Sequence, residues 1–331
     1  MAEATSPMEV AGAIGEHSVE DVRPVGRWRS RLRAGLPGVA FVLILGACFA
    51  LEPTALSYRG VGLLLSPAVP LIFAAMSVSF VILVGDIDLG LGYAVGLSNV
   101  IIASWLVSSP WLAVAGCVGL VVAYGLIGAL VHVRRVPAIV ATLGASFVWL
   151  GLGLTILPIP GGSAPSWLTQ FFSWQPPLIP LPIVLAAVVA LIGYFLCYRW
   201  PFGVVLRGAG GSPDAARLAG WSMLRIRVVA YLLAGAFGVL AGLALTGITA
   251  SGDVTASANF TLLAIASVIL GGAEFAGGVA APVGTVLGAM TISLTGTVLG
   301  FLNVSSDFDT GAQGLILIIV LGGRVFMRRR R

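Results

Sequence analysis

The sequence contains no lysine, and charged residues of any kind are few. Charged side chains make up 9% of the chain, against roughly a quarter in an ordinary soluble domain, whereas 58% of the residues are hydrophobic. A soluble globule of about this length buries only about three quarters of the surface that its unfolded chain exposes, so many apolar side chains would face water. The composition therefore excludes a soluble fold and predicts an all-α integral membrane protein.

The 18 basic residues are all arginine, and the net charge is +5. They lie in loops and termini between apolar runs and do not form one basic stripe, so we expect a lipid bilayer and no nucleic acid as partner.

Cysteine and histidine are also scarce. Cys48, Cys117 and Cys197 lie in apolar stretches, without a CxxC pair and away from His17 and His132. This spacing predicts free buried thiols and no metal site. The P-loop, GxSxG and HExxH patterns are missing too, so we expect a non-catalytic chain that binds no cofactor itself.

Apolar runs that approach the roughly 20 residues needed to cross a bilayer recur along the chain. We identify ten candidates, near 35–52, 61–84, 89–107, 110–131, 137–157, 179–198, 228–250, 260–271, 281–301 and 311–326. The sequence thus predicts a cytoplasmic tail at 1–33, expected to be flexible, a transmembrane domain at 34–327 and a basic cytoplasmic end at 328–331.

The arginines predict the topology, because short cytoplasmic loops collect basic residues. With ten spans and the first tail inside, Arg134, Arg135, the loop 199–227 and the C-terminal arginines all fall inside, and only Arg59 falls outside. We therefore expect both termini in the cytoplasm.

The loop 199–227 carries the signals of a short helix. They are a capping serine, a proline suited to the first helical position, an acidic residue at the positive helix start and a terminating glycine, namely Ser212, Pro213, Asp214 and Gly220. The exposed Arg217 and Leu218 suit the docking of a cytoplasmic partner, and a helix lying on anionic lipid headgroups fits the composition equally well.

Two carboxylates, Asp86 and Asp88, interrupt the apolar stretch 82–99. Charge at membrane depth is costly and normally faces a cavity, a partner or a helix end. Asp88 can cap the following helix, and the nearby glycines permit a tight reversal; these are Gly85, Gly90 and Gly92. Because the topology puts this turn at the cytoplasmic end, we favour a structural turn over direct substrate contact.

Residues 268–290 place Glu274 between two glycine pairs, Gly271/Gly272 and Gly277/Gly278. Such glycines allow close backbone approach, which predicts a re-entrant turn or a helix crossing. VILGGA at 268–273 also echoes VILVGD at 81–86, an internal similarity that chance can produce in a chain this rich in Val, Ile, Leu and Gly.

Four segments resemble, in order, the signatures of one family. GDIDLGLG resembles GGIDLSVG, VPAIVATLG resembles IPPFIATLG, GAGGSPDAARLAG resembles GGNEEAARLSG, and LGGAEFAGGVAAPVGTVLGA resembles LGGTSLAGGRGSVWGTLLGA. These signatures are those of permease subunits of bacterial ABC importers of the ribose, xylose, arabinose and galactoside class. The resemblance covers nearly the whole predicted membrane portion.

The resemblance implies the ABC importer permease fold in the bacterial inner membrane and a homo- or heterodimer of permeases. It also implies a separate cytoplasmic ATPase that binds ATP and Mg, and an extracytoplasmic solute-binding protein. The short helix would be the coupling helix that docks on the ATPase, with Ser212, Pro213, Asp214, Ala215, Ala216, Arg217, Leu218 and Gly220.

The chain departs from the family at two positions, where Asp86 replaces a glycine and Glu274 replaces a small polar residue, so we expect both to affect either gating or the cytoplasmic exit. Branched-chain amino acid permeases usually lack this motif combination, so a sugar or sugar-like solute is favoured; nucleosides and other small polar solutes stay open. An ion-coupled secondary transporter is the alternative, and it would need carboxylates near the membrane midplane.

Polar residues within spans are candidates for the substrate path, and packing hydrogen bonds explain them equally well; they are Asn99, Thr142, Ser146 and Trp149.

Overall fold

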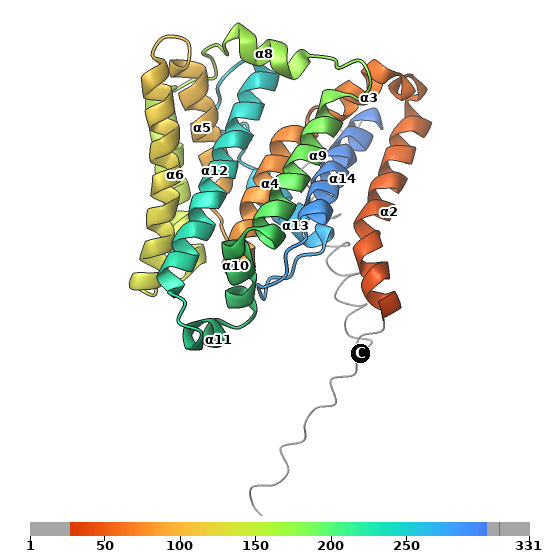
Figure 1. Cartoon of the computed structure of the whole chain (residues 1–331). Coiled ribbons are helices and arrows are strands. Elements are labelled where there is room, and N and C mark those ends of the chain that lie inside the picture. Colours follow the sequence, from red (N-terminus) through yellow and green to blue (C-terminus); the bar gives the residue numbers. More distant parts are fainter. Residues whose placement is uncertain (1–26, 303–310, 312–331) are drawn as a thin grey trace, which may run out of the picture. The chain divides into compact units, whose positions relative to one another are not determined.

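The computed structural model describes residues 27–302 and residue 311. The chain divides into two units, residues 1–35 and 36–331, and the helices of the second form the bundle in Figure 1. The predictions for most of the tail 1–33, for the tenth candidate span beyond residue 311 and for the basic end 328–331 concern residues outside the described ranges.

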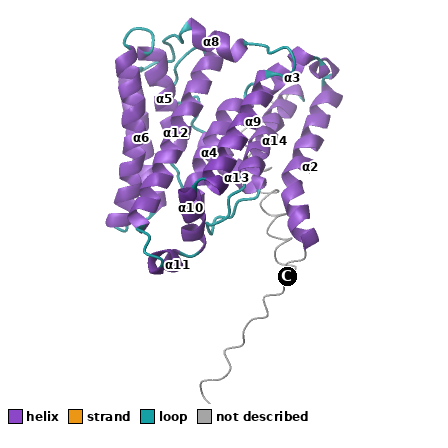
Figure 2. Cartoon of the chain, viewed as in Figure 1, coloured by secondary structure: helices purple, strands orange, loops and turns teal. Residues whose placement is uncertain are grey.

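Helices make up nearly all of the regular structure (Figure 2), and the described residues form no β-strand beyond an isolated bridge between Gly161 and Gly252. The helices are α2 (Arg27–Leu51), α3 (Tyr58–Leu65), α4 (Ala68–Leu83), α5 (Leu91–Trp105), α6 (Pro110–Val133), α7 (Ala138–Ile156), α8 (Ser166–Ser173), α9 (Leu181–Tyr194), α10 (Pro201–Gly211), α11 (Pro213–Leu218), α12 (Met223–Thr249), α13 (Phe260–Gly271) and α14 (Pro282–Phe301). A 3₁₀ turn (Pro53–Leu56) precedes α3, and a π-helical turn (Phe195–Arg199) extends α9.

Five of these helices are long and apolar enough to cross a membrane: α6, α7, α9 with its π-helical extension, α12 and α14. A sixth span results if α3 and α4, which meet at a bend of 43°, count as one. Three further apolar helices are shorter, namely Gly35–Leu51, α5 and α13. An all-α membrane protein is confirmed, whereas the count of ten spans and the cytoplasmic placement of the termini stay predictions.

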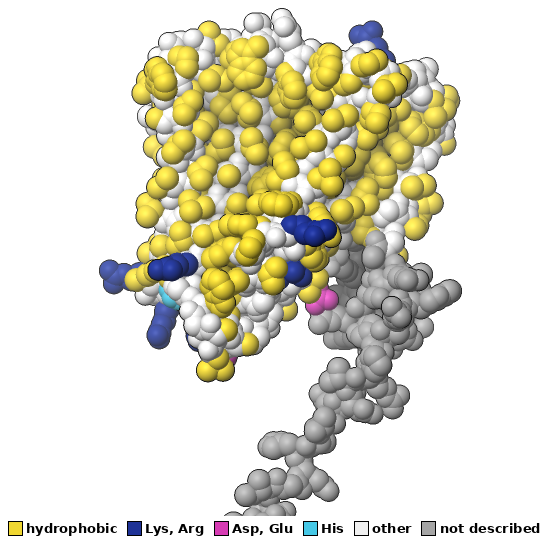
Figure 3. Space-filling model, in the orientation of Figure 1, with side chains coloured by type: hydrophobic (Ala, Val, Ile, Leu, Met, Phe, Trp, Pro, Cys, Tyr) yellow, Lys and Arg dark blue, Asp and Glu magenta, His cyan; other side chains and the backbone are white. Residues whose placement is uncertain are grey.

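The outer helices present apolar side chains to the surroundings. Trp111, Leu126 and Phe147, on α6 and α7, are at least 64% exposed. Figure 3 shows hydrophobic side chains over most of the visible face, with positive side chains gathered at the end where α10 and α11 lie. An apolar belt with charge at its ends is the surface that a bilayer requires.

Helices α4 and α5 lie at the centre and are buried along almost their whole length. Helix α12 packs against α4, α5 and α6, and α13 and α14 pack on each other and on α4. Helix α7 covers α5 from another side. The apolar composition of α4 and α5 therefore serves protein packing, whereas that of α6 and α7 mainly serves lipid contact.

The short helices α5 and α13 each follow a non-helical segment, 84–90 and 250–259 respectively. The second of these segments runs along the glycine face of α5. A Cβ atom on Gly96 would lie 2.1 Å from the carbonyl oxygen of Val254, and one on Gly92 would lie 2.7 Å from that of Ser257. Irregular backbone is tolerated at membrane depth only where protein covers it, and α5 supplies that cover.

The sequence echo between 81–86 and 268–273 corresponds to one shared helix ending. In α4 the Asp86 amide donates to the Val81 carbonyl at 3.2 Å and Gly85 donates to Ile82 at 2.9 Å. In α13 the equivalent bonds run from Ala273 to Val268 and from Gly272 to Ile269. Each pair is a Schellman motif, with a glycine of positive φ, Gly85 at 82° or Gly272 at 115°.

The close contact at Gly96 can be tested by adding one methyl group. Alanine at position 96 should lower the free energy of unfolding by about 1–3 kcal/mol, because the added Cβ meets fixed backbone. Gly119→Ala, on α6 with open space around it, is the matched control, since both changes bring the same gain in helix propensity. Thermal unfolding of the purified protein in detergent measures the difference, and equal stability of the two variants would contradict the packing described.

Candidate functional site

Helix α11 is the short helix that the loop 199–227 predicts. The hydroxyl of Ser212 accepts a hydrogen bond from the Ala215 amide at 3.4 Å, and Pro213 occupies the first helical position. Gly220 has a φ of 81° and follows the helix end. The cap, the proline and the glycine thus lie where the sequence predicts them, and the helix spans six residues.

The two faces of α11 differ. Ala216 is buried and belongs to the main apolar core. Leu218 is 91% exposed, and Arg217 pairs with Asp214 at 3.1 Å on the open surface. Such a surface pair contributes little to stability. Figure 1 shows α11 at the tip of the bundle, and the exposure of Leu218, Arg217 and Asp214 shows that no described residue covers its outer face.

Three backbone segments meet just above α11. A Cβ on Gly210, in α10, would lie 1.8 Å from the Leu83 carbonyl oxygen at the end of α4 and 2.5 Å from the Gly278 amide. The Gly278 amide itself donates to the Leu83 carbonyl at 2.9 Å. Gly277 and Gly278 have φ values of 83° and 77°, which side chains disfavour. The close backbone approach predicted for these glycines is therefore present, and it connects α10, α4 and the loop after α13.

The glycine pair Gly271/Gly272 has a second contact. A Cβ on Gly271 would lie 2.4 Å from the backbone of Gly284, so α13 and α14 cross with their backbones touching. Glu274 lies half-buried in the turn that follows. The helix crossing predicted from these glycines is confirmed.

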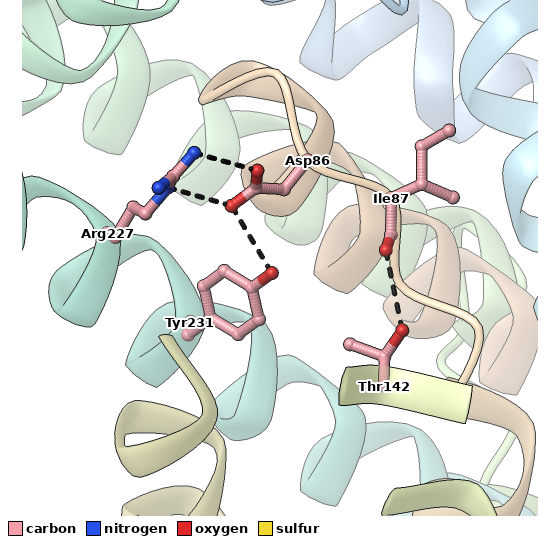
Figure 4. Close-up of polar contacts among 5 residues, drawn as sticks. All are labelled: Asp86, Ile87, Thr142, Arg227 and Tyr231. Carbon is pink, nitrogen blue, oxygen red and sulfur yellow. Dashed lines mark hydrogen bonds and ion pairs between the residues drawn. The ribbon is translucent and has the colours of Figure 1, made fainter. Parts of the chain in front are cut away.

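Asp86 makes the most extensive ionic contact near this junction (Figure 4). Its side chain is 7% exposed, and its two oxygens lie 3.1 Å from Nη2 and 3.1 Å from Nε of Arg227. The hydroxyl of Tyr231 donates to Oδ2 at 3.3 Å. Arg227 and Tyr231 are one turn apart on α12, so both reach the same carboxylate. The sequence reasoning missed these two partners, although their i, i+4 spacing was visible.

Asp88 is fully buried. Its Oδ1 accepts from the Gly90 amide at 2.7 Å, and its Oδ2 accepts from the Tyr124 hydroxyl at 3.1 Å. The predicted role as helix cap is wrong in detail, because Gly90 occupies the N-cap position of α5 and makes no side-chain cap bond. Asp88 lies two residues before this N-cap and closes the turn that leads into α5, since its carboxylate accepts from the amide two positions ahead.

The predicted path residues are all buried, and three of them use their polar groups for packing. Asn99 donates to Thr246 at 2.8 Å and to the Ser251 carbonyl at 2.9 Å, and it accepts from the Asp253 amide at 2.7 Å. Thr142 accepts from the Leu89 amide at 2.9 Å. Thr142 and Ser146 each donate to a backbone carbonyl of their own helix. These bonds favour the packing alternative for all three.

Trp149 differs from the other three. Its ring stacks on Tyr124 with centroids 6.4 Å apart, and its indole N–H has no hydrogen-bond partner among the described residues. Its assignment to a substrate path stays a prediction.

Comparison with known proteins relates this arrangement to a transport family. Residues 61–321 match the family described as branched-chain amino acid transport system / permease component. The chain is 32% identical to the ribose import permease protein RbsC of Bacillus subtilis, over 75% of this chain and 79% of the relative. It is 27% identical to the protein of that name from Escherichia coli strain K12, over 86% and 91%.

A third relative, the autoinducer 2 import system permease protein LsrD of Klebsiella pneumoniae, is 29% identical over 90% of this chain and 91% of its own length. No solved structure matches the chain. The family match confirms the resemblance carried by the four sequence motifs. The chain therefore belongs to this family of transport permease components, and it is a multi-pass protein of the inner membrane.

Proposed function

We propose that this chain is the membrane-spanning, non-catalytic subunit of an ATP-driven importer and forms the path for a sugar or sugar-like solute. The observation that carries the proposal is the similarity, over most of the chain, to import permeases named for ribose and for autoinducer 2. The four ordered motifs support the same conclusion. A nucleoside or a branched-chain amino acid is the alternative solute; the family description names the latter, but the relatives named for ribose and autoinducer 2 do not favour either.

The proposed importer needs partners that this chain does not supply. They are a second permease subunit, a cytoplasmic ATPase that binds ATP and Mg, and an extracytoplasmic binding protein that delivers the solute. We place Ser212–Leu218 and Gly220 against the ATPase, because α11 is exposed at the tip of the bundle while its inner side belongs to the core. A docking helix needs this combination of a free outer face and a firm base.

The contacts around α11 suggest how ATP-driven motion enters the bundle. Helix α10, which leads into α11, packs at Gly210 against the end of α4 and the glycine turn 277–278. Helix α12, which follows α11, packs against α4, α5 and α6. A push on α11 would therefore act on the central helices from two sides.

An ion-coupled secondary transporter is less well supported. It would use a carboxylate that gains and loses protons in contact with the path. Asp86 instead pairs with Arg227, and Asp88 is fully enclosed by its turn and Tyr124.

Uptake in proteoliposomes distinguishes the two mechanisms. The permease with its ATPase and binding protein should accumulate solute only when ATP is supplied, and a proton or sodium gradient without ATP should have no effect. Uptake that persists without the ATPase and follows a pH gradient would overturn the proposal.

Arg217→Glu should leave insertion and folding intact and uncouple ATP hydrolysis from uptake. The change reverses the charge on an exposed face and adds repulsion toward Asp214, so the helix would lose its fit to the ATPase. We expect solute uptake per ATP hydrolysed to fall about tenfold or more, as for loss of one central interface residue. Arg59→Glu, in α3 at the other end of the bundle, should leave binding of the ATPase unchanged. Normal coupled uptake in the Arg217 variant would count against docking through α11.

The solute class can be tested on the assembled complex with its binding protein. Ligands that bind the folded state raise the melting temperature according to their concentration and affinity. In a thermal-shift panel of pentoses, hexoses, nucleosides and branched-chain amino acids, we expect stabilisation by a sugar. A shift with leucine, isoleucine or valine alone would support the alternative solute.

A further inference from the structure

The ion pair between Asp86 and Arg227 joins two parts of the chain that the proposed transport cycle must move together. Arg227 is the fifth residue of α12, whose first residue, Met223, lies five positions after the end of α11. Asp86 lies in the non-helical segment 84–90 between α4 and α5. Figure 4 shows the guanidinium of Arg227 facing the carboxylate of Asp86 across the gap between these segments.

The segment 84–90 is also held at its far end. The Leu89 amide donates to Thr142 on α7, and Asp88 accepts from Tyr124 on α6. Tyr124 lies nine residues before the end of α6, which is about 14 Å along the helix axis. The segment therefore connects the base of α12 with the interior faces of α6 and α7.

The nature of the Asp86 contact argues for a mechanical role. A buried ion pair is weak evidence for stability, because apolar residues of similar volume often stabilise a protein as well or better. Here Nη2 donates a charge-assisted hydrogen bond to Oδ1, which fixes direction as well as distance, and Nε lies 3.1 Å from Oδ2 without a hydrogen bond to any described residue. The side chain of Arg227 is 28% exposed, whereas that of Asp86 is 7% exposed. The partner on α12 is thus the more open one, and the partner on 84–90 is enclosed.

Non-helical backbone between two helices is where hinge motion is usually absorbed. The segment 84–90 has this form, and Gly85 at its start has a φ of 82°. The helix end before it is fixed to α10 and to the loop after α13 through the Leu83 carbonyl. Motion of the base of α12 would then reach the segment chiefly through Asp86.

We propose that Asp86 and Arg227 are positioning residues for transport, which carry the displacement of α11 and α12 to the segment 84–90 and so to the inner faces of α6 and α7. This inference rests on the proposed function and adds residues on which the coupling depends. Tyr231 supports the pair by holding Oδ2 of Asp86 in place.

The test follows the exposure of the segment and does not need the solute. In a chain carrying Cys48→Ala, Cys117→Ala and Cys197→Ala, Ile87→Cys introduces one thiol next to Asp86, at a partly buried position. The complex with the ATPase is labelled with N-ethylmaleimide, with and without MgATP and vanadate. We expect the labelling rate to differ severalfold between the two conditions.

Asp86→Asn and Arg227→Gln, each added to this chain, should abolish the nucleotide-dependent difference while ATP hydrolysis continues. The double variant Asp86→Asn/Arg227→Gln should behave like either single variant, because residues that act as one unit are not additive. The double variant leaves no unpaired buried charge, so the test can be made on it if a single variant fails to fold. Arg225→Gln, two residues away on the exposed side of α12, is the matched control and should keep the difference.

A nucleotide-dependent difference that survives in the folded double variant would overturn the inference. The inference would also be overturned if the Ile87→Cys complex with the ion pair intact takes up solute with ATP but is labelled at the same rate with and without MgATP and vanadate. In that case the proposed function would stand, and only the role of the pair would fail. Loss of ATP-driven uptake in the complex without substitutions would overturn both.

Discussion

Lipid cannot hydrogen-bond a protein backbone, and this constraint determines the centre of the bundle. The segments 84–90 and 250–259 lie between helices, and side chains of neighbouring helices supply partners for amides in both. Thr142 accepts from the Leu89 amide, and Asn99 accepts from the Asp253 amide at 2.7 Å. In the first turn of α5, Thr261 accepts from the Gly92 amide at 2.8 Å. The hydroxyls and amides buried among apolar helices thus belong to the framework of the fold. Any substrate path must be formed by other groups or by a rearrangement that frees these.

Glycine contributes to the centre of the bundle in a second way, by allowing backbones to pack directly against each other. A backbone without side chains can approach a carbonyl closely, which is why Gly96 lies on Val254 and Gly210 on Leu83. At Gly210 the contact joins α10 to α4 without any side chain that could change rotamer. Such a contact transmits displacement by shape alone, because protein interiors are close-packed and yield little. The glycine junction therefore behaves as a fixed attachment between the base of α11 and the central helices.

The sequence predicted what depends on local chemistry. Low charge predicts the membrane, Ser212 and Gly220 predict the ends of α11, and the glycine pairs predict close approach. It did not predict contacts that need the fold, such as that of Arg227 with Asp86, which is 141 positions away. The number of spans also depends on the fold, because an apolar run has the same hydropathy whether it forms a full crossing or, like α5 and α13, a short helix after an irregular segment.

The two attachments of the loop 199–227, at Gly210 and at Arg227, differ in kind. The Gly210 contact is backbone against backbone, whereas the Asp86 contact is ionic and includes an arginine with partial access to solvent. The ionic contact is made through two side chains that can turn while they stay paired, which backbone packed against backbone cannot do. If α11 moves with the ATPase, α10 would stay packed against α4 while the ion pair carries the movement of α12 to the segment 84–90. A fixed backbone contact on one side of α11 and an ionic link on the other would turn a push on one short helix into a rotation of α12 against α4, which the segment 84–90 follows.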